Sequence, residues 1–269
     1  MMKEGTNPSM YEMPKATRLL VLDDLTASNP FLEDDFKELM TLFDTKNRPI
    51  VVSQKMLSLR LRKKYEREVE KNRIEPLDIA IAIGSSGKKV FDELRLTMPA
   101  CIVSPKRVTL EDGSMRIVSK KGISISEDLR SALRSLNIID SSRINNIGII
   151  DDTVFSGITA KSIIDELQVL FPLSSKTILT LTHISQFSDQ HMGENQNVIS
   201  AVSLRTSKKM SDGLNSLDAR DFVDTSAIPL SNGISISFKE EENWMRSWFG
   251  LNYEKARNLC DQMQTVYSA

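Results

Sequence analysis

Through the middle of the chain, short apolar runs alternate with segments whose apolar residues recur at helical spacing. Short continuous apolar runs bounded by turn residues predict strands that are buried on both faces of a parallel sheet. The segments between them predict crossover helices, so we expect an α/β fold with a mainly parallel sheet and flanking helices within residues 76–205. The predicted strands are residues 77–83, 100–104, 147–150, 176–184 and 197–204, and the predicted helices are residues 90–96, residues 124–136 with Ser126 as a candidate cap, and the segment after Thr159.

The two ends of the chain do not follow this alternation. Residues 1–16 carry Gly5, Pro8 and Pro14 and predict a loose tail, and the residues beyond 205 are polar and rich in turn formers. We therefore expect residues 1–75 and 206–269 to be additions to the 76–205 core. Their patterns predict strands at 17–23 and 234–238, helices at 31–43 and 54–73, and one or two helices in 240–263, with a break near Gly250.

The composition is that of an ordinary globular protein, with 40% hydrophobic and 26% charged residues among 269. A net charge of −1 argues against wholesale nucleic-acid binding. The predicted helix at 54–73 has a basic half, but Glu66, Glu68 and Glu70 interleave with the bases and favour a solvated helix with ion pairs. Two cysteines, no apolar run of membrane-spanning length and no signal-peptide core predict a cytoplasmic protein.

The most informative stretch is residues 146–166. A predicted buried strand ends in two adjacent carboxylates, Asp151 and Asp152, and a short turn with Ser156, Gly157 and Thr159 leads into a helix. Backbone N–H groups of such a turn, with the positive end of the helix dipole, form an anion site. Carboxylates do not favour a phosphate but suit hydroxyl groups or the water shell of a metal. A ribose 5-phosphate, which has a phosphate beside a diol, fits both halves.

The sequence IIDDTVFSGIT in this stretch resembles the phosphoribosyl pyrophosphate (PRPP) signature of type I phosphoribosyltransferases. The resemblance covers about a dozen residues, and an ordinary strand-to-helix turn is the alternative. It implies the fold of that family and a catalytic role for Asp151 and Asp152, which would hold the ribose hydroxyls and the water shell of Mg²⁺. The implied PRPP-binding residues are Thr153, Val154, Phe155, Ser156, Gly157, Ile158 and Thr159.

A second glycine-bearing segment, residues 84–89, follows the first predicted strand of the core. Two residues separate its glycines, so it is not a Walker A loop. It resembles the short pyrophosphate-binding loop of the same family, which implies that Ser85, Ser86 and Gly87 bind PRPP and that Lys88 is catalytic. The alternative is a plain strand-to-helix turn with surface lysines.

Asp112-Gly113 between two β-rich arms predicts a hairpin. In the family, a long flexible loop or hairpin at this place closes over the pyrophosphate. The resemblance therefore implies that Lys106, Arg107, Lys120 and Lys121 are the cations of a mobile lid. An exposed hairpin with ordinary surface charges is the alternative.

The implied reaction transfers ribose 5-phosphate from PRPP to an unidentified small-molecule acceptor with release of pyrophosphate, and Mg²⁺ is the implied cofactor. One or both terminal additions could form the hood that covers the acceptor in this family. A homodimer is the candidate assembly. Two other functions remain open: a non-catalytic PRPP- or nucleotide-binding regulator, and an interaction protein with a vestigial core.

Phe155 departs from the 6-oxopurine enzymes of the family, which have an acid at this position. Because a phenyl ring exchanges no proton, hypoxanthine and guanine are expected to be poor acceptors. Phe155 with Trp244 or Trp248 could line an apolar acceptor slot, although core packing is the alternative for all three. His183 and His191 have no metal-ligand spacing and are interpreted as structural.

Overall fold

The computed structural model describes residues 19–22, 33–43, 50–109, 115–136, 144–155, 157–183, 192, 197–203, 223–224, 246 and 249–268. The chain divides into two compact units. One unit is Val52–Ser203, and the other combines Met1–Val51 with Leu204–Ala269. None of the helices in these described ranges is long and apolar enough to cross a membrane.

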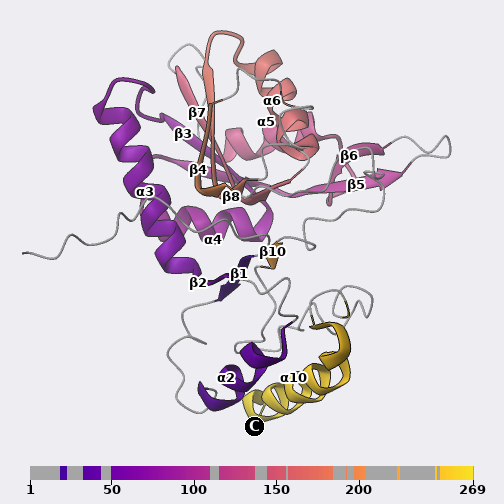
Figure 1. The fold of residues 1–269 in the computed structure, drawn as a ribbon. Helices are drawn as coiled ribbons and strands as arrows, with labels where there is room; N and C mark the ends of the chain where they lie inside the picture. Colours follow the sequence, from indigo (N-terminus) through magenta and orange to yellow (C-terminus); the bar gives the residue numbers. More distant parts are fainter. Residues whose placement is uncertain are drawn as a thin grey trace, which may run out of the picture. The chain divides into compact units, whose positions relative to one another are not determined.

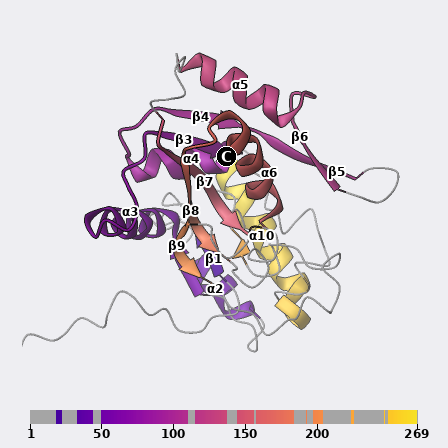
Figure 2. The same ribbon diagram turned by 90° about the horizontal axis from the view of Figure 1, so that it is seen from above.

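The larger unit is built on a five-stranded sheet in the order β4-β3-β7-β8-β9 (Figures 1 and 2). All four neighbouring pairs are parallel, which confirms the expected α/β fold. Because crossover helices cover both faces of such a sheet, its three central strands are mostly buried, as the apolar runs predict. The strands are β3 (Ile79–Ile83), β4 (Ala100–Val103), β7 (Asn146–Val154), β8 (Ser175–His183) and β9 (Asn197–Ser203).

The main hydrophobic core lies between one face of this sheet and two helices, α5 (Ile125–Ser135) and α6 (Ile158–Leu170). Alternate strand residues such as Ile79, Ile81 and Ile83 enter this core. Because neighbouring side chains on a strand point to opposite faces, the intervening residues face the helices on the other side. Those helices are α3 (Gln54–Glu70) and α4 (Gly84–Leu94), which contact each other and strands of the sheet (Figure 2).

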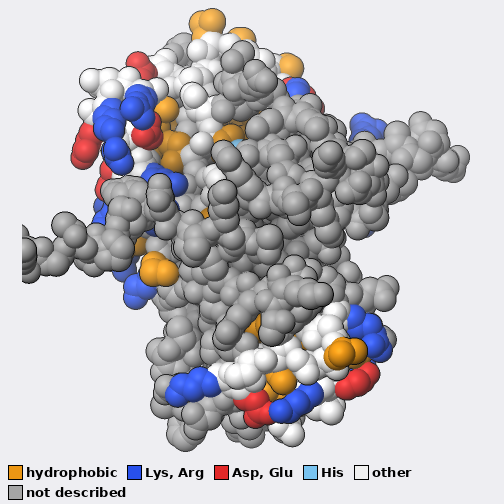
Figure 3. Space-filling view, viewed as in Figure 1, with side chains coloured by type: hydrophobic (Ala, Val, Ile, Leu, Met, Phe, Trp, Pro, Cys, Tyr) orange, Lys and Arg blue, Asp and Glu red, His pale blue; other side chains and the backbone are white. Residues whose placement is uncertain are grey.

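Helix α3 belongs to the larger unit. Its Gln54 Nε2 and Ser58 Oγ donate to the Glu93 carboxylate of α4 at 2.9 and 2.6 Å. Lys64 Nζ donates to the Ser200 carbonyl of β9 at 2.7 Å. The compact unit therefore begins at Val52, and the boundary expected at residue 75 falls inside it. The solvent side of α3 shows the expected mixture of charges (Figure 3), with Arg62 Nε 2.7 Å from Glu66 Oε1.

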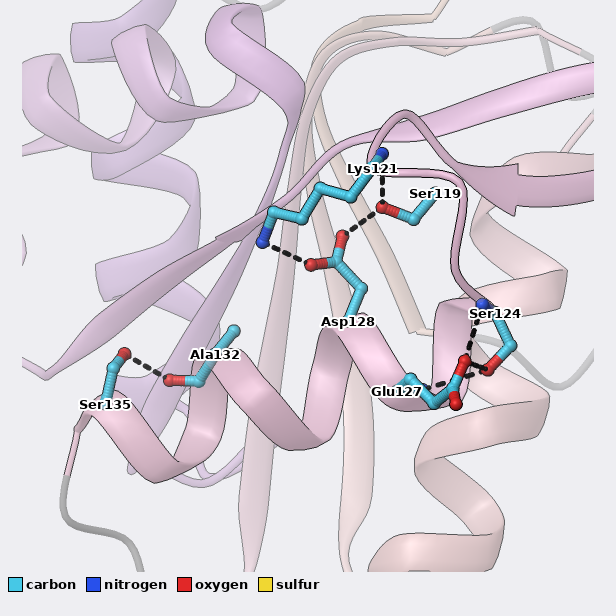
Figure 4. A network of polar contacts seen from close by, with 7 residues as sticks. All are labelled: Ser119, Lys121, Ser124, Glu127, Asp128, Ala132 and Ser135. Atoms are coloured by element: carbon cyan, nitrogen blue, oxygen red, sulfur yellow. Dashed lines mark hydrogen bonds and ion pairs between the residues drawn. The ribbon is translucent and has the colours of Figure 1, made fainter.

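The predicted hairpin is confirmed as two antiparallel strands, β5 (Pro105–Thr109) and β6 (Met115–Ser119). Helix α5 follows it and is capped by Ser124, not by Ser126. Ser124 Oγ accepts from the Glu127 N–H at 3.1 Å, and the Glu127 carboxylate accepts from the Ser124 N–H at 2.9 Å (Figure 4). These reciprocal bonds form a capping box, which fixes the start of the helix.

The smaller unit joins segments from both ends of the chain. Strand β1 (Leu19–Leu22) lies between β10 (Val223–Asp224) and β2 (Ile50–Ser53), a strand that the sequence did not predict. Helix α2 (Glu33–Leu42) contacts α10 (Tyr253–Ser268), which follows a short 3₁₀ turn, Gly250–Asn252, at the expected break. The Phe43 and Phe249 rings stack with centroids 4.5 Å apart. Trp244, Trp248, His191 and the predicted strand at 234–238 lie outside the described residues.

Candidate functional site

The acid pair lies at the carboxyl edge of the central sheet. Strand β7 continues to Val154, so it contains Thr153 and Val154, which were expected in the turn, as well as Asp151 and Asp152. Strand β3 already ends at Ile83, and its Ala82 is paired with Ile150, the residue before the acids. The pair therefore extends past one neighbouring strand into the region where open α/β sheets bind ligands.

The turn after β7 brings a helix N-terminus to the same edge. Gly157 has a φ of +74°, which glycine adopts without the strain that a side chain adds, and α6 begins at Ile158. The first intrahelical bond, from Lys161 N–H to the Gly157 carbonyl, is 2.8 Å long. The N–H groups of the first turn of α6, including that of Thr159, are those that a helix leaves available to an anion. Ser156 lies outside the described residues.

The glycine-bearing segment after β3 is helical, which corrects the expected loop. Helix α4 begins at Gly84, whose φ is +65°, and Ser85 and Ser86 are exposed in its first turn. Gly87 is buried against β7: a Cβ at this position would lie 2.4 Å from the Ile150 carbonyl oxygen. Its lack of a side chain thus allows α4 to lie directly on β7. Lys88 forms an ion pair with Asp92 on the same helix.

The surroundings of the acid pair disfavour the charged form of Asp151. Desolvation and the neighbouring Asp152 carboxylate raise the pKa of Asp151 well above its usual value. The Asp152 N–H, which donates to Asp151 Oδ1 at 2.9 Å, and the Arg107 guanidinium of β5 act in the opposite direction. Arg107, one of the predicted lid cations, is thus close enough to act on Asp151. Perturbed carboxyl groups of this kind are concentrated at functional sites.

The four predicted lid cations fall into two groups. Lys106, Arg107 and Lys120 are exposed on or beside the hairpin. Lys121 is instead bound at the hairpin root, where its Nζ lies 2.5 Å from Oδ1 of the buried Asp128 (Figure 4). Lys121 therefore fixes the root of the hairpin to α5.

Asp128 has no exposed surface and also accepts from Ser119 Oγ at 2.8 Å. Burial alone would raise the pKa of Asp128, but the hydrogen bonds from Lys121 and Ser119 outweigh it and lower the pKa. This ionised carboxylate holds the end of β6 against α5.

Sequence reasoning did not find the two threonines on β8 beside the acid pair. Thr180 is paired with Asp151, and its hydroxyl donates to the Asp152 carbonyl at 3.2 Å or to the Thr182 carbonyl at 2.9 Å. Thr182 is paired with Thr153, and its buried hydroxyl has no partner among the described residues. The only sequence signal was their polarity inside a predicted strand.

A cavity of about 390 Å³ lies apart from the acid pair. It is formed by β6, the start of α5 and α6. Its lining residues are Arg116, Ile117, Ser124, Ile125, Ile158, Lys161, Ser162, Asp165 and Glu166.

Within the described ranges, no group of three or more His, Cys, Asp or Glu residues could hold a metal ion. The two carboxylates of the acid pair nevertheless fit Mg²⁺, which prefers oxygen ligands. This ion commonly binds through one or two carboxylates plus water and substrate phosphates.

No protein-family model matches the chain, and no curated protein matches it either. Solved structures do. A hypothetical protein from Neisseria gonorrhoeae with bound ppGpp is 16% identical, with a TM-score of 0.40, over 59% of this chain and 86% of that one. A purine phosphoribosyltransferase from Pyrococcus horikoshii is 13% identical, with a TM-score of 0.35, over 57% and 86%. An adenine phosphoribosyltransferase from Thermoanaerobacter pseudethanolicus is 14% identical, with a TM-score of 0.37, over 55% and 80%.

Proposed function

We propose that this chain is a phosphoribosyltransferase that binds PRPP and transfers its ribose 5-phosphate to an acceptor, with release of pyrophosphate. One observation carries the proposal. Helix α4 begins directly after β3, and α6 begins at Ile158, after the turn that follows the neighbouring parallel strand β7. The acid pair lies near the end of β7, at the same edge of the sheet as these two helix starts. Two anion sites beside two carboxylates match a ligand with phosphates at both ends of a diol.

Each part of PRPP has a group that suits it. The first turn of α6, from Gly157 to Thr159, would bind the 5-phosphate. The first turn of α4, with the exposed Ser85 and Ser86, would bind the pyrophosphate. Asp151 and Asp152 would accept hydrogen bonds from the ribose hydroxyls. Donors at the pyrophosphate stabilise the charge that develops on the leaving group, which is the largest electrostatic demand of this transfer.

Mg²⁺ would supply further neutralisation of the pyrophosphate when it is bound with PRPP. The acid pair would hold it through water, and a cation there would also offset the repulsion between Asp151 and Asp152. Arg107, which already acts on Asp151, would approach the same charges from the hairpin.

Calorimetry with PRPP and Mg²⁺ tests the binding step. The double variant Asp151→Asn, Asp152→Asn should lose on the order of 1.5–3 kcal/mol for each charge-assisted hydrogen bond removed. Glu66→Gln, which removes one partner of an exposed ion pair on α3, is the control and should bind as the unmodified protein does. Equal affinity in the double variant and the unmodified protein would exclude the acid pair as the ribose site.

A separate part of the proposal concerns which acceptors the protein uses. Phe155 is 8% exposed directly after β7, so its ring packs in the interior next to the turn. A phenyl ring there cannot exchange a proton with a purine, so hypoxanthine and guanine should be poor acceptors. Phe155→Ala should raise the apparent KM of the true acceptor more than it weakens PRPP binding. Rapid turnover of hypoxanthine would show that this interpretation of Phe155 is wrong.

A second candidate function is a PRPP-binding regulator without turnover. Lys88, the predicted catalytic cation, is paired with Asp92 on its own helix, and this exposed pair must open before Lys88 can bind the pyrophosphate. Pyrophosphate release measured with PRPP and a panel of nitrogen bases separates the two. Tight PRPP binding without release for any base would support the regulator.

A further inference from the structure

The cavity between β6, α5 and α6 adjoins the proposed PRPP site through Ile158, but neither Asp151 nor Asp152 lines it. Its volume of about 390 Å³ lies within the range of small-molecule sites. The three walls come from the hairpin, from the capped start of α5 and from the face of α6 that carries Lys161, Asp165 and Glu166.

Two of these walls are held together by the polar network at the hairpin root. Ser124, which lines the cavity, closes the capping box with Glu127 (Figure 4). Asp128, in the first turn of the same helix, binds Ser119 at the end of β6. Strand β6 and the start of α5 therefore form one rigid corner, and Arg116 and Ile117 lie on the β6 side of it.

Side chains of both charges line the cavity, and they do not all form ion pairs with one another. Arg116 and Glu166 each have no ion-pair or hydrogen-bond partner among the described residues. Lys161 and Asp165 are paired, but their side chains are 41% and 58% exposed. Exposed pairs four residues apart on a helix stabilise little, so both groups can exchange partners at small cost.

Apolar surface separates these charges. Ile117, Ile125 and Ile158 each come from a different wall of the cavity. A ligand that satisfies all of the lining must therefore combine an anionic group, hydroxyl or amino donors, and an apolar face.

We propose that this cavity binds a ribonucleoside monophosphate. Arg116 and Lys161 would bind the phosphate, since guanidinium and ammonium groups form the strongest hydrogen bonds with such an anion. The carboxylates of Asp165 and Glu166 would accept from the ribose hydroxyls or a base amino group. The three isoleucines would cover a face of the base.

Occupancy of this cavity would affect both elements of the proposed active site. Strand β6 is one arm of the hairpin, and Ile158 is the first residue of α6 and lies within the segment assigned to the 5-phosphate. A ligand that bridges them would restrict hairpin movement. If the proposed function is correct and the acceptor is a base, the bound nucleotide belongs to the class of the product, and the cavity is a feedback site.

Calorimetry on the full chain with AMP, GMP, CMP and UMP tests the site. At least one nucleotide should bind, and Arg116→Gln and Glu166→Gln should each weaken it at least tenfold. Arg130→Gln, which alters an exposed arginine of α5 away from the cavity, should have no effect. Asp152→Asn should leave this binding unchanged even where it abolishes PRPP binding.

Three results would overturn the proposal. They are no binding of any of the four nucleotides at millimolar concentration, undiminished binding in both cavity variants, and loss of binding in Asp152→Asn alone. The last result would place the nucleotide at the acid pair. Failure of PRPP to bind would contradict the proposed function but would leave the nucleotide measurement decisive for the cavity.

Discussion

Replacement of Asp128 by alanine should destabilise the larger unit and release the root of the hairpin. Asp128 is fully buried and accepts hydrogen bonds from Ser119 Oγ at 2.8 Å and Lys121 Nζ at 2.5 Å. The Ser104 N–H is a third donor to this carboxylate. Alanine removes all three acceptor interactions at once, and no described side chain replaces them.

The expected loss follows from what each partner can do afterwards. Ser119 is 1% exposed, so its hydroxyl loses its acceptor without gaining water, which costs about 1–3 kcal/mol. Lys121 is 59% exposed and is rehydrated, so its ion pair accounts for at most about 1 kcal/mol. The free energy of unfolding should therefore fall by about 1–4 kcal/mol.

Denaturant unfolding as a function of pH is the measurement. Because the folded state lowers the pKa of Asp128, its stabilisation is present above the ordinary pKa of about 3.8 and is lost as the pH falls through the folded pKa. The unmodified protein should thus exceed Asp128→Asn in free energy of unfolding by its full margin at pH 7, and this margin should shrink below pH ~4. Hydrogen exchange should also rise at the root of the hairpin.

Asp92→Ala is the matched control, because it breaks a Lys–Asp pair whose side chains are 41% and 55% exposed. It should cost no more than about 0.5 kcal/mol. If Asp128→Ala unfolds at the same denaturant concentration as this control, the buried network does not anchor the hairpin and the reasoning fails.

Three further predictions concern the sheet edge. Gly87→Ala should lower the free energy of unfolding by at least about 1–3 kcal/mol and weaken PRPP binding, since its Cβ would overlap the Ile150 carbonyl oxygen. An unchanged free energy of unfolding would contradict the close packing of α4 on β7. Thr182→Val should raise the free energy of unfolding by about 1 kcal/mol, because it removes a buried hydroxyl without a described partner, whereas Thr180→Val should lower it; equal effects would refute the distinction. Asp151→Asn should raise the free energy of unfolding at neutral pH, and this gain should grow as the pH rises above ~4. The reason is that the raised pKa of Asp151 means that its charged form destabilises the folded state. A pH-independent difference between the two proteins would refute this.

The parallel sheet could be predicted because buried strands leave a strong pattern of apolar residues. The end of β7 could not, since Thr153 and Val154 look like the start of a turn in the sequence. They remain in the strand because β8 is equally long and continues to pair with them as far as Val154 and His183. Strand length at this edge is set by the neighbouring strand, which a local pattern does not contain.

Helix α4 shows a second limit of local reasoning. Two glycines and two serines in four residues are typical of a loop, yet Gly87 is buried in the first turn of a helix. The reason is tertiary, since only glycine allows α4 to lie against the Ile150 carbonyl. The cap of α5, in contrast, could have been found: Ser124 and Glu127 have the spacing of a capping box, and Ser126 does not.

Asp128 and Asp151, two aspartates of the larger unit, differ in a way that bears on function. Asp128 has three donors, and its pKa is lowered, so its charge contributes to stability. Asp151 has a backbone donor but also a carboxylate neighbour, and its pKa is raised, so its charge opposes folding. A hydrogen-bonded aspartate at a hairpin root is explained by structure alone. An aspartate that costs stability at the carboxyl edge of a parallel sheet, between two helix N-termini, is explained when its partner is a ligand.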